Sequence, residues 1–167
     1  MSDKETDLID FLRPSLYLFE ELHPLYVKIA NEEKKVYFSL LGRKKKATAV
    51  KVAFERTLGL ASAPMADICS KLVYASDYIP KDYGTEMLKL YQLYIDIVES
   101  RISILSRFIR EGLTDEVKAF NQRELEKCTK YDTHYKKMYD VTQDECQLVV
   151  MMSPYDNIYE LLNALEK

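Results

Sequence analysis

The sequence predicts an all-α fold, namely an antiparallel helical bundle of about four long helices with short additional helices at the termini. Three observations lead to this prediction. The 167 residues include only four glycines and five prolines, which hairpins and tight turns usually require. Apolar residues recur every three or four positions over long stretches, which is the helical period. No two apolar runs are joined by a hairpin turn.

The composition favours one globular domain that spans residues 1–167. Hydrophobic residues make up 47% of the chain, and a chain of this length can bury about two-thirds of its unfolded surface without disulfides or metal. The three cysteines are scattered and form no C-x-x-C pair, so a disulfide framework or a zinc knuckle is not expected. The first residues are polar, and no apolar run approaches the roughly 20 residues needed to span a bilayer. We therefore expect a cytoplasmic location and no transmembrane segment.

The N-terminal third predicts a short helix followed by a long one. Apolar residues scatter with helical spacing over residues 7–21, and we expect Pro14 in a first helical turn. Pro24 either opens a new helix or kinks an existing one. The first long helix is expected at residues 24–41, where Leu40 continues an apolar face. That face also contains Leu25, Ile29 and Val36.

The second long helix is expected at residues 44–76. Gly42 before it suits a helix end because glycine adopts the left-handed conformation freely, although the apolar pattern also permits a helix that runs through. Pro64 predicts a break or kink near Ala63, since proline lacks a donor and crowds the preceding turn. Residues 78–84 contain a proline and a glycine without helical periodicity, which predicts a connection.

The third and fourth long helices are expected at residues 85–111 and 114–140. Thr85 and Thr114 are suitable N-caps, because a threonine oxygen can accept a hydrogen bond from a free backbone amide. The apolar stripe of the third helix covers more than half its circumference, so this helix is expected at the centre of the bundle. The apolar run at residues 146–152 fits a buried helix or a short strand equally well.

The C-terminal residues predict a final amphipathic helix, with Ser153 as cap and Pro154 in the first turn. This helix and the tyrosines near residues 74–83 suggest surfaces that bind another protein, because tyrosine is enriched at interfaces. Our first functional interpretation is therefore a non-catalytic protein that interacts with a partner or with itself. The candidate contact residues are Tyr74, Tyr78, Ile79, Tyr83, Tyr155, Ile158, Tyr159 and Leu162.

A basic segment supports an alternative function. The net charge is −3, yet residues 34–56 contain eight basic residues and one acidic residue. Such a cluster could bind nucleic acid or an anionic surface by contacting phosphates. The candidate residues are Arg43, Lys44, Lys45, Lys46, Lys51 and Arg56. The competing interpretation is a solvated helix junction, where positive charge next to a preceding helix C-terminus is stabilising.

A second alternative is a metal-dependent bundle enzyme. Glu20 and His23 have the Glu-x-x-His spacing that places two ligands on one helical face. A di-iron site needs two such motifs, and the other histidine, His134, is preceded three residues earlier by Tyr131. No phosphate-binding glycine loop, nucleophile elbow or kinase signature is present. We therefore predict no catalytic residue, no metal ligand set and no cofactor.

Overall fold

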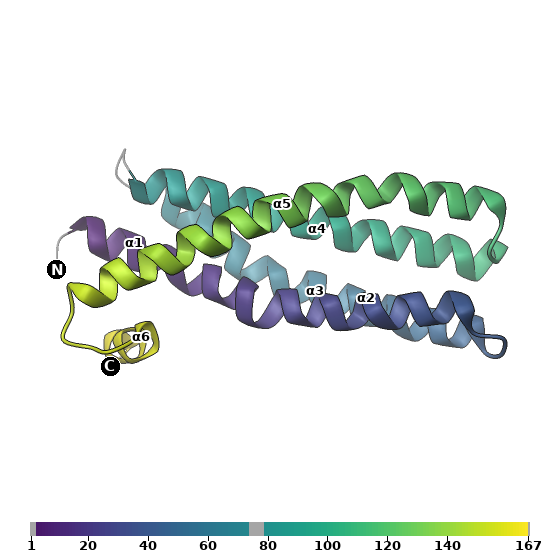
Figure 1. Cartoon of the computed structure of the whole chain (residues 1–167), viewed down its shortest axis with the longest axis horizontal. Helices are drawn as coiled ribbons and strands as arrows, with labels where there is room; N and C mark the ends of the chain where they lie inside the picture. The colour runs from purple at the N-terminus through teal and green to yellow at the C-terminus, as the bar shows by residue number, and fades with distance from the viewer. Residues whose placement is uncertain (1–2, 74–78, 167) are drawn as a thin grey trace.

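The computed structural model describes the backbone of residues 3–73 and 79–166, and every element in these ranges is helical. The predicted all-α class is confirmed. Long helices run up and down along one axis, with one short helix packed near the end of the bundle where the chain begins (Figure 1). The elements are α1 (Asp3–Tyr17), η1 (Leu18–Leu22), α2 (His23–Phe38), α3 (Arg43–Leu72), α4 (Ile79–Glu111), α5 (Asp115–Met151) and α6 (Ile158–Glu166).

Helix α4 lies at the centre, as its wide apolar stripe predicted. It packs along α3 on one side and along α5 on the other. Tyr91 and Tyr94 of α4 are completely buried. Each donates its hydroxyl to a backbone carbonyl of the first helix, Tyr91 to Pro14 at 2.6 Å and Tyr94 to Leu22 at 3.3 Å. The two hydroxyls are thus satisfied inside the core, as buried polar groups must be.

Pro14 lies inside α1 instead of in a first helical turn, so that prediction was wrong. A proline in a helix interior leaves the carbonyl four residues earlier without its usual donor. Here that carbonyl belongs to Asp10, and the ammonium of Lys71 donates to it at 3.2 Å. Lys71 also contacts the Asp67 carboxylate at 3.1 Å. A lysine from α3 thus replaces the missing backbone donor, which explains why α1 continues past Pro14.

The first helix also continues past Pro24, by way of the π-helical turn η1. The backbone amide of His23 donates to the carbonyl of Leu18, five residues earlier, instead of four. Leu18, Phe19 and Leu22 are buried on the inner side of this turn. A π turn accommodates one extra residue within a helix. Residues 3–38 therefore form one long helical segment, and the expected separate helices at 7–21 and 24–41 are joined.

Gly42 lies between α2 and α3, where one helix stops and a new one starts. This is one of the two interpretations that the sequence allowed; the other was a helix that runs through. The Gly42 φ of 67° lies in the left-handed region, which disfavours any residue with a Cβ. Helix α2 ends at Phe38, and Leu40 lies in the connection with 91% of its surface exposed. The prediction that Leu40 continues the apolar core face was therefore wrong.

Pro64 does not break α3, so of the break or kink expected near Ala63 the break was wrong. The helix is continuous from Arg43 to Leu72. The carbonyl that Pro64 leaves without a backbone donor belongs to Leu60, a residue on the exposed side of the helix with 46% of its surface accessible. Exposed carbonyls exchange a backbone donor for water at small cost.

Helix α4 begins at Ile79, six residues before the expected start at Thr85. Pro80 falls in its first turn, where a missing amide donor costs nothing. Gly84 is helical and allows close packing. A Cβ on Gly84 would lie 2.7 Å from the Phe11 ring and 2.9 Å from Leu72. The glycine thus reflects the approach of α1 and α3 to α4. The predicted connection at 78–84 was wrong over residues 79–84, which are helical, and residue 78 lies outside the described residues.

Thr114 caps α5 as predicted, because its hydroxyl accepts a hydrogen bond from the Val117 amide at 3.1 Å. The helix then continues to Met151, so the apolar run at 146–152 is helical almost to its end. Helix α6 begins at Ile158, later than the Ser153-Pro154 signal indicated. Asn157 makes the cap there, its side chain accepting from the Glu160 amide at 2.9 Å. None of the helices in the described ranges is long and apolar enough to cross a membrane.

Candidate functional site

Of the predicted contact residues near the start of α4, the structure describes the side chain of Tyr83 alone. Tyr74 and Tyr78 lie outside the described residues, and of Ile79 only the helical backbone is described. Tyr83 is 4% exposed. Its hydroxyl forms a 2.6 Å hydrogen bond with Thr142 Oγ1, and burial raises the pKa of the phenol. Tyr83 is therefore a core contact between α4 and α5, which corrects its assignment to a partner surface.

The predicted contact residues on α6 and just before it mostly pack against the rest of the chain. Ile158 and Leu162 are buried against the bundle, Tyr155 is half-buried, and Tyr159 is 50% exposed. Arg13 of α1 holds α6 in place, because its guanidinium donates to the Leu162 carbonyl at 2.7 Å. The same guanidinium pairs with a terminal carboxylate of α6, that of Glu166, at 2.6 Å. The apolar face of α6 covers its own bundle, so the surface proposed there is reduced to Tyr159.

An open groove of about 770 Å³ lies between α2 and α5, with α4 at its base. Sequence reasoning did not identify it. Its walls are mostly apolar and include Val27, Ala30, Ile97, Ile104, Val117 and Leu125. The side chains on its edges include Lys34 and Lys118, both exposed. A groove of this size with few polar groups is typical of a binding site for an apolar ligand or segment.

A buried polar network forms the base of the open groove. Glu33 of α2 is 2% exposed and Arg101 of α4 is 7% exposed. Their side chains pair at 3.3 Å, Tyr37 donates its hydroxyl to Glu33 at 2.6 Å, and Arg101 donates to Asn121 at 2.8 Å. Burial raises the pKa of the Glu33 carboxyl, while the Arg101 charge opposes this shift. The network fixes α2, α4 and α5 relative to one another beneath the groove.

The sequence contained a signal for this network. Val98, Ile102 and Leu105 lie on the apolar stripe of α4, and Arg101 interrupts that stripe. A charged residue within an apolar helical face is rarely buried unless it is paired. Its partner on α2 was not predictable, because many acidic residues occupy helical surfaces in this chain.

Glu20 and His23 do not form a metal site with further ligands. Among the side chains that the structure describes, no group of three or more His, Cys, Asp or Glu residues is placed to hold a metal ion. Instead, His23 Nδ1 lies 2.8 Å from the Tyr131 hydroxyl, and the His23 ring stacks on Tyr135 with centroids 4.0 Å apart. Burial lowers the pKa of His23, and the Asp132 carboxylate opposes this effect. His23 thus connects the first helix to α5.

His134 also connects helices. It is 8% exposed, and its Nε2 lies 2.9 Å from the Glu86 carbonyl and 3.4 Å from the Glu86 carboxylate. These contacts join α5 to α4. Neither histidine lies in the open groove, so the structure brings no histidine to the base of that site.

The predicted basic residues separate into two groups. Arg43, Lys44, Lys45 and Lys46 form the first turn of α3, at the end of the bundle farthest from α6 (Figure 1). Lys51 pairs with Glu55 at 3.8 Å. Arg56 lies ten residues beyond Lys46, or about 15 Å along the helix at the usual rise. The four residues of the first turn are therefore the concentrated part of the segment.

The comparisons with known proteins give no assignment: the chain has no significant match to any family model, curated protein or solved structure.

Proposed function

We propose that this protein is a non-catalytic binding protein whose open groove holds an amphipathic helix of a partner protein. The supporting observation concerns the interface between the first long helix, residues 3–38, and α5, which we call the seam. The two ends of this seam differ. At one end it is closed by direct packing, and α6 lies against it. At the other end it is the open groove.

Helix α6 shows within the same chain how such a seam is covered. Its nine residues bury Ile158, Leu161 and Leu162 against the bundle. The open groove extends along α2 from Tyr26 to Phe38, which corresponds to about 18 Å, or three helical turns. A short amphipathic helix of this length presents anchors at spacings of three and four residues, which is a common mode of peptide recognition.

The charges at the groove edges specify the chemistry of the occupant. Lys34 and Lys118 are exposed on opposite sides, on α2 and α5. Asp132 is the acidic residue at the end of the groove near Tyr26. Val27 and Leu125 add exposed apolar surface, at 40% and 41%. The groove therefore fits a helix with an apolar stripe and with acidic residues on both sides of that stripe.

Site-specific photo-crosslinking tests the proposal. We would place a benzoylphenylalanine at Leu125, on the groove edge, and in a matched variant at Leu148, which is 52% exposed on α5 away from the groove. Crosslinking in extracts of the native cells, followed by mass spectrometry, identifies the crosslinked segment. The expected result is crosslinking from position 125 alone to an acidic amphipathic segment. Crosslinks to a second copy of this chain, or equal yields from both positions, contradict the proposal.

A binding measurement completes the test. A synthetic peptide of the crosslinked segment is expected to bind the protein, and the double variant Val27→Glu/Leu125→Glu is expected to weaken binding at least about tenfold, because it places carboxylates on both apolar edges. Both positions are partly exposed, so the helical content should be unchanged by circular dichroism. Unchanged affinity in the double variant means that the peptide does not occupy the groove.

A further inference from the structure

The end of α2 and its connection to α3 carry the most exposed large apolar side chains of the described molecule. Phe38, Leu40 and Leu41 are 83%, 91% and 83% exposed. We call these three residues the apolar tip. Single exposed apolar residues are ordinary on protein surfaces, whereas several that lie together indicate a contact surface.

The turn that presents the apolar tip is well ordered by hydrogen bonds. Gly42 takes the left-handed conformation that reverses the chain. The Ser39 amide donates to the Val36 carbonyl at 3.2 Å. The Ser39 hydroxyl donates to the Lys35 carbonyl at 3.0 Å. Arg43 donates through Nε to the Ser39 carbonyl. These bonds fix the backbone in a shape that directs the leucines outward, so their exposure is a property of the folded turn.

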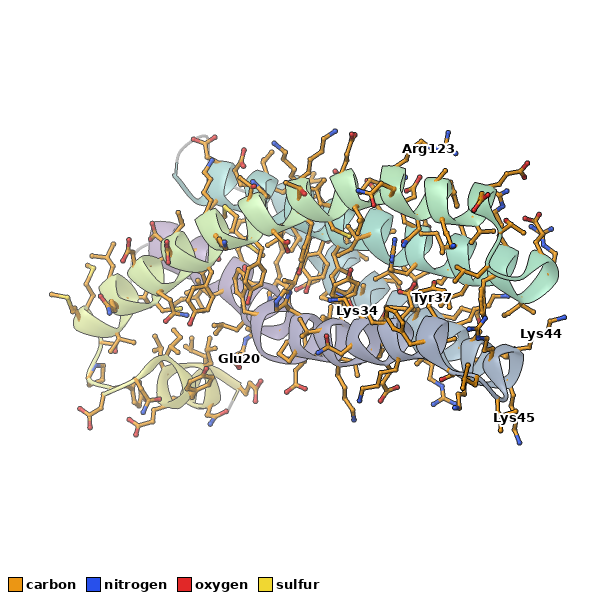
Figure 2. All side chains as sticks on the ribbon, turned by 45° about the vertical axis from the view of Figure 1, so that its right-hand side comes forward. Glu20, Lys34, Tyr37, Lys44, Lys45 and Arg123 are labelled. Atoms are coloured by element: carbon orange, nitrogen blue, oxygen red, sulfur yellow. The ribbon has the colours of Figure 1, made fainter. Side chains whose placement is uncertain are left out.

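A group of basic residues surrounds the apolar tip. Arg43 to Lys46 follow it directly, and Lys34 and Lys35 lie in the last turns of α2 before it. Lys44 and Lys45 point away from the bundle at its tip (Figure 2). In the part of the chain that the structure describes, no acidic side chain forms an ion pair with Arg43, Lys44, Lys45 or Lys46. Their positive charge is therefore available to an external anion.

We infer that the apolar tip and the basic residues around it dock this protein onto the surface of an anionic lipid bilayer. The leucines and Phe38 enter the region between headgroups and acyl chains, and the lysines and Arg43 contact lipid phosphates. Apolar burial and attraction to anionic lipids act together in such interfacial binding. Phe38 and Lys34 also line the open groove, whereas Leu40 and Leu41 do not. The bilayer contact is therefore tested at Leu40, Leu41, Lys44 and Lys45, which the open groove does not use.

The apolar tip favours a bilayer over a nucleic acid as the occupant. Nucleic acids bind basic surfaces through phosphates and present flat bases that stack on aromatic rings. Two of the three apolar residues here are leucines, which do not stack on bases. A bilayer provides both partners at once, phosphates for the basic residues and hydrocarbon for the leucines.

The nearby α4–α5 turn limits the orientation of the docked protein. This turn lies at the same end of the bundle (Figure 1), and Glu111 at the end of α4 and Glu116 at the start of α5 flank it. Arg107 contacts both carboxylates, at 3.5 Å and 3.9 Å, which partly offsets their charge. A negatively charged membrane repels the remaining negative charge of Glu111 and Glu116. We therefore expect the bundle axis to tilt, with the α2–α3 turn nearest the lipid.

Vesicle sedimentation tests the inference with the full chain. The protein is expected to bind vesicles of phosphatidylcholine with 30% phosphatidylserine, and to bind pure phosphatidylcholine vesicles much more weakly. Binding should fall as salt rises, because salt screens exposed charges. Lys44→Ala/Lys45→Ala is expected to weaken binding to the anionic vesicles by roughly thirtyfold, and Leu40→Ser/Leu41→Ser by about tenfold or more.

Matched controls carry the same changes elsewhere. Lys130→Ala/Lys136→Ala removes two exposed lysines of α5, and Leu60→Ser/Leu148→Ser removes two exposed leucines of α3 and α5. Both controls should bind like the unchanged protein. Equal losses in a control and in the corresponding tip variant indicate general charge or hydrophobicity and overturn the inference, as does the absence of any binding to the anionic vesicles.

A fluorescent reporter distinguishes insertion from phosphate contact alone. The chain contains no tryptophan, so Leu41→Trp introduces a single one at the apolar tip. Its emission is expected to shift to shorter wavelength with anionic vesicles and to be quenched by brominated acyl chains. If instead the protein binds an RNA duplex more tightly than the vesicles, and Leu40→Ser/Leu41→Ser does not affect RNA binding, the basic residues serve a nucleic acid and the inference is wrong.

Discussion

The two halves of the seam between the first helix and α5 differ in what holds them. At the closed half, rings from both helices interlock: Phe19 and His23 pack against Tyr135, and His23 contacts Tyr131. At the open half, α2 and α5 separate, and the polar network of Glu33 and Arg101 lies beneath the groove. At the closed half the rings fill the helix interface, whereas at the open half Tyr26, Tyr37 and Phe38 line a space that another molecule can enter.

The largest effect is expected where the rings meet. Tyr131 is fully buried against Tyr26, Tyr94 and Tyr135. Tyr131→Ala should lower the free energy of unfolding by about 4 kcal/mol, because it removes a large ring and leaves a cavity. Tyr159→Ala, at an exposed position, should change it by no more than about 0.5 kcal/mol. Urea denaturation at pH 7 measures both. Comparable losses would mean that the closed half does not depend on ring packing.

The polar network of the open half is expected to give the next largest effect. Arg101→Met should cost about 3 kcal/mol, because it leaves the Glu33 carboxylate buried without its cation. Glu33→Gln/Arg101→Met should recover part of this loss, since neither residue then carries charge. The same urea experiment compares the variants. A double variant that is less stable than Arg101→Met alone would show that the network stabilises through hydrogen bonds and not through charge pairing.

A smaller effect tests how tightly α4 packs against α1 and α3, at the end of the bundle where the seam is closed. Gly84→Ala should destabilise the protein by about 1 kcal/mol, because its Cβ would press on Phe11 and Leu72 and force them to shift. Gly59 is also helical, but a Cβ added there would meet no atom of another residue within 4 Å. Gly59→Ala should therefore stabilise by about 0.5 kcal/mol through helix propensity. The midpoints of thermal unfolding should move in opposite directions, and a common direction would contradict the packing argument.

The smallest expected effect is an opposite response of the two halves to pH. Burial lowers the pKa of His23, so its stabilising contribution is present above its ordinary value of 6.5 and is lost as pH falls towards its folded pKa. Burial raises the pKa of Glu33, so its contribution is present below 4.5 and is lost as pH rises through its folded pKa.

Variants separate the two responses. His23→Phe retains a ring for stacking on Tyr135 and removes the titrating group, so the loss of stability between pH 7 and pH 5.5 should be smaller than in the unchanged protein. Glu33→Gln should reduce the loss that accompanies a rise in pH from 4.5. Unfolding free energies across this range measure both. Identical pH profiles for His23→Phe and the unchanged protein would show that His23 does not titrate differently on folding.

Local sequence signals predicted some helix boundaries well and others poorly. Thr114 and Gly42 were informative, because a cap and a left-handed glycine act within one turn of the backbone. Pro14 and Gly84 misled, because their consequences depend on distant groups. Lys71 supplies a donor where Pro14 cannot, and Phe11 requires the small residue at position 84.

The candidate site residues also divide into those that the local sequence reveals and those whose position depends on distant contacts. Arg43 to Lys46 were identified from the sequence, since consecutive charges remain on the surface in almost any fold. Tyr83 and Leu162 were assigned to a surface and are buried, because tyrosine and leucine patterns do not reveal which side of a helix the rest of the bundle covers. The exposure of Leu40 was missed for the same reason.

The sequence by itself determined the helical class and the number of long helices, because periodicity, caps and the scarcity of turn residues act over a few neighbouring positions. Only the tertiary structure decided which apolar faces are covered. That outcome depends on contacts between residues far apart in the chain, such as Glu33 with Arg101 and His23 with Tyr131. The open groove and the apolar tip are surfaces that those contacts leave uncovered.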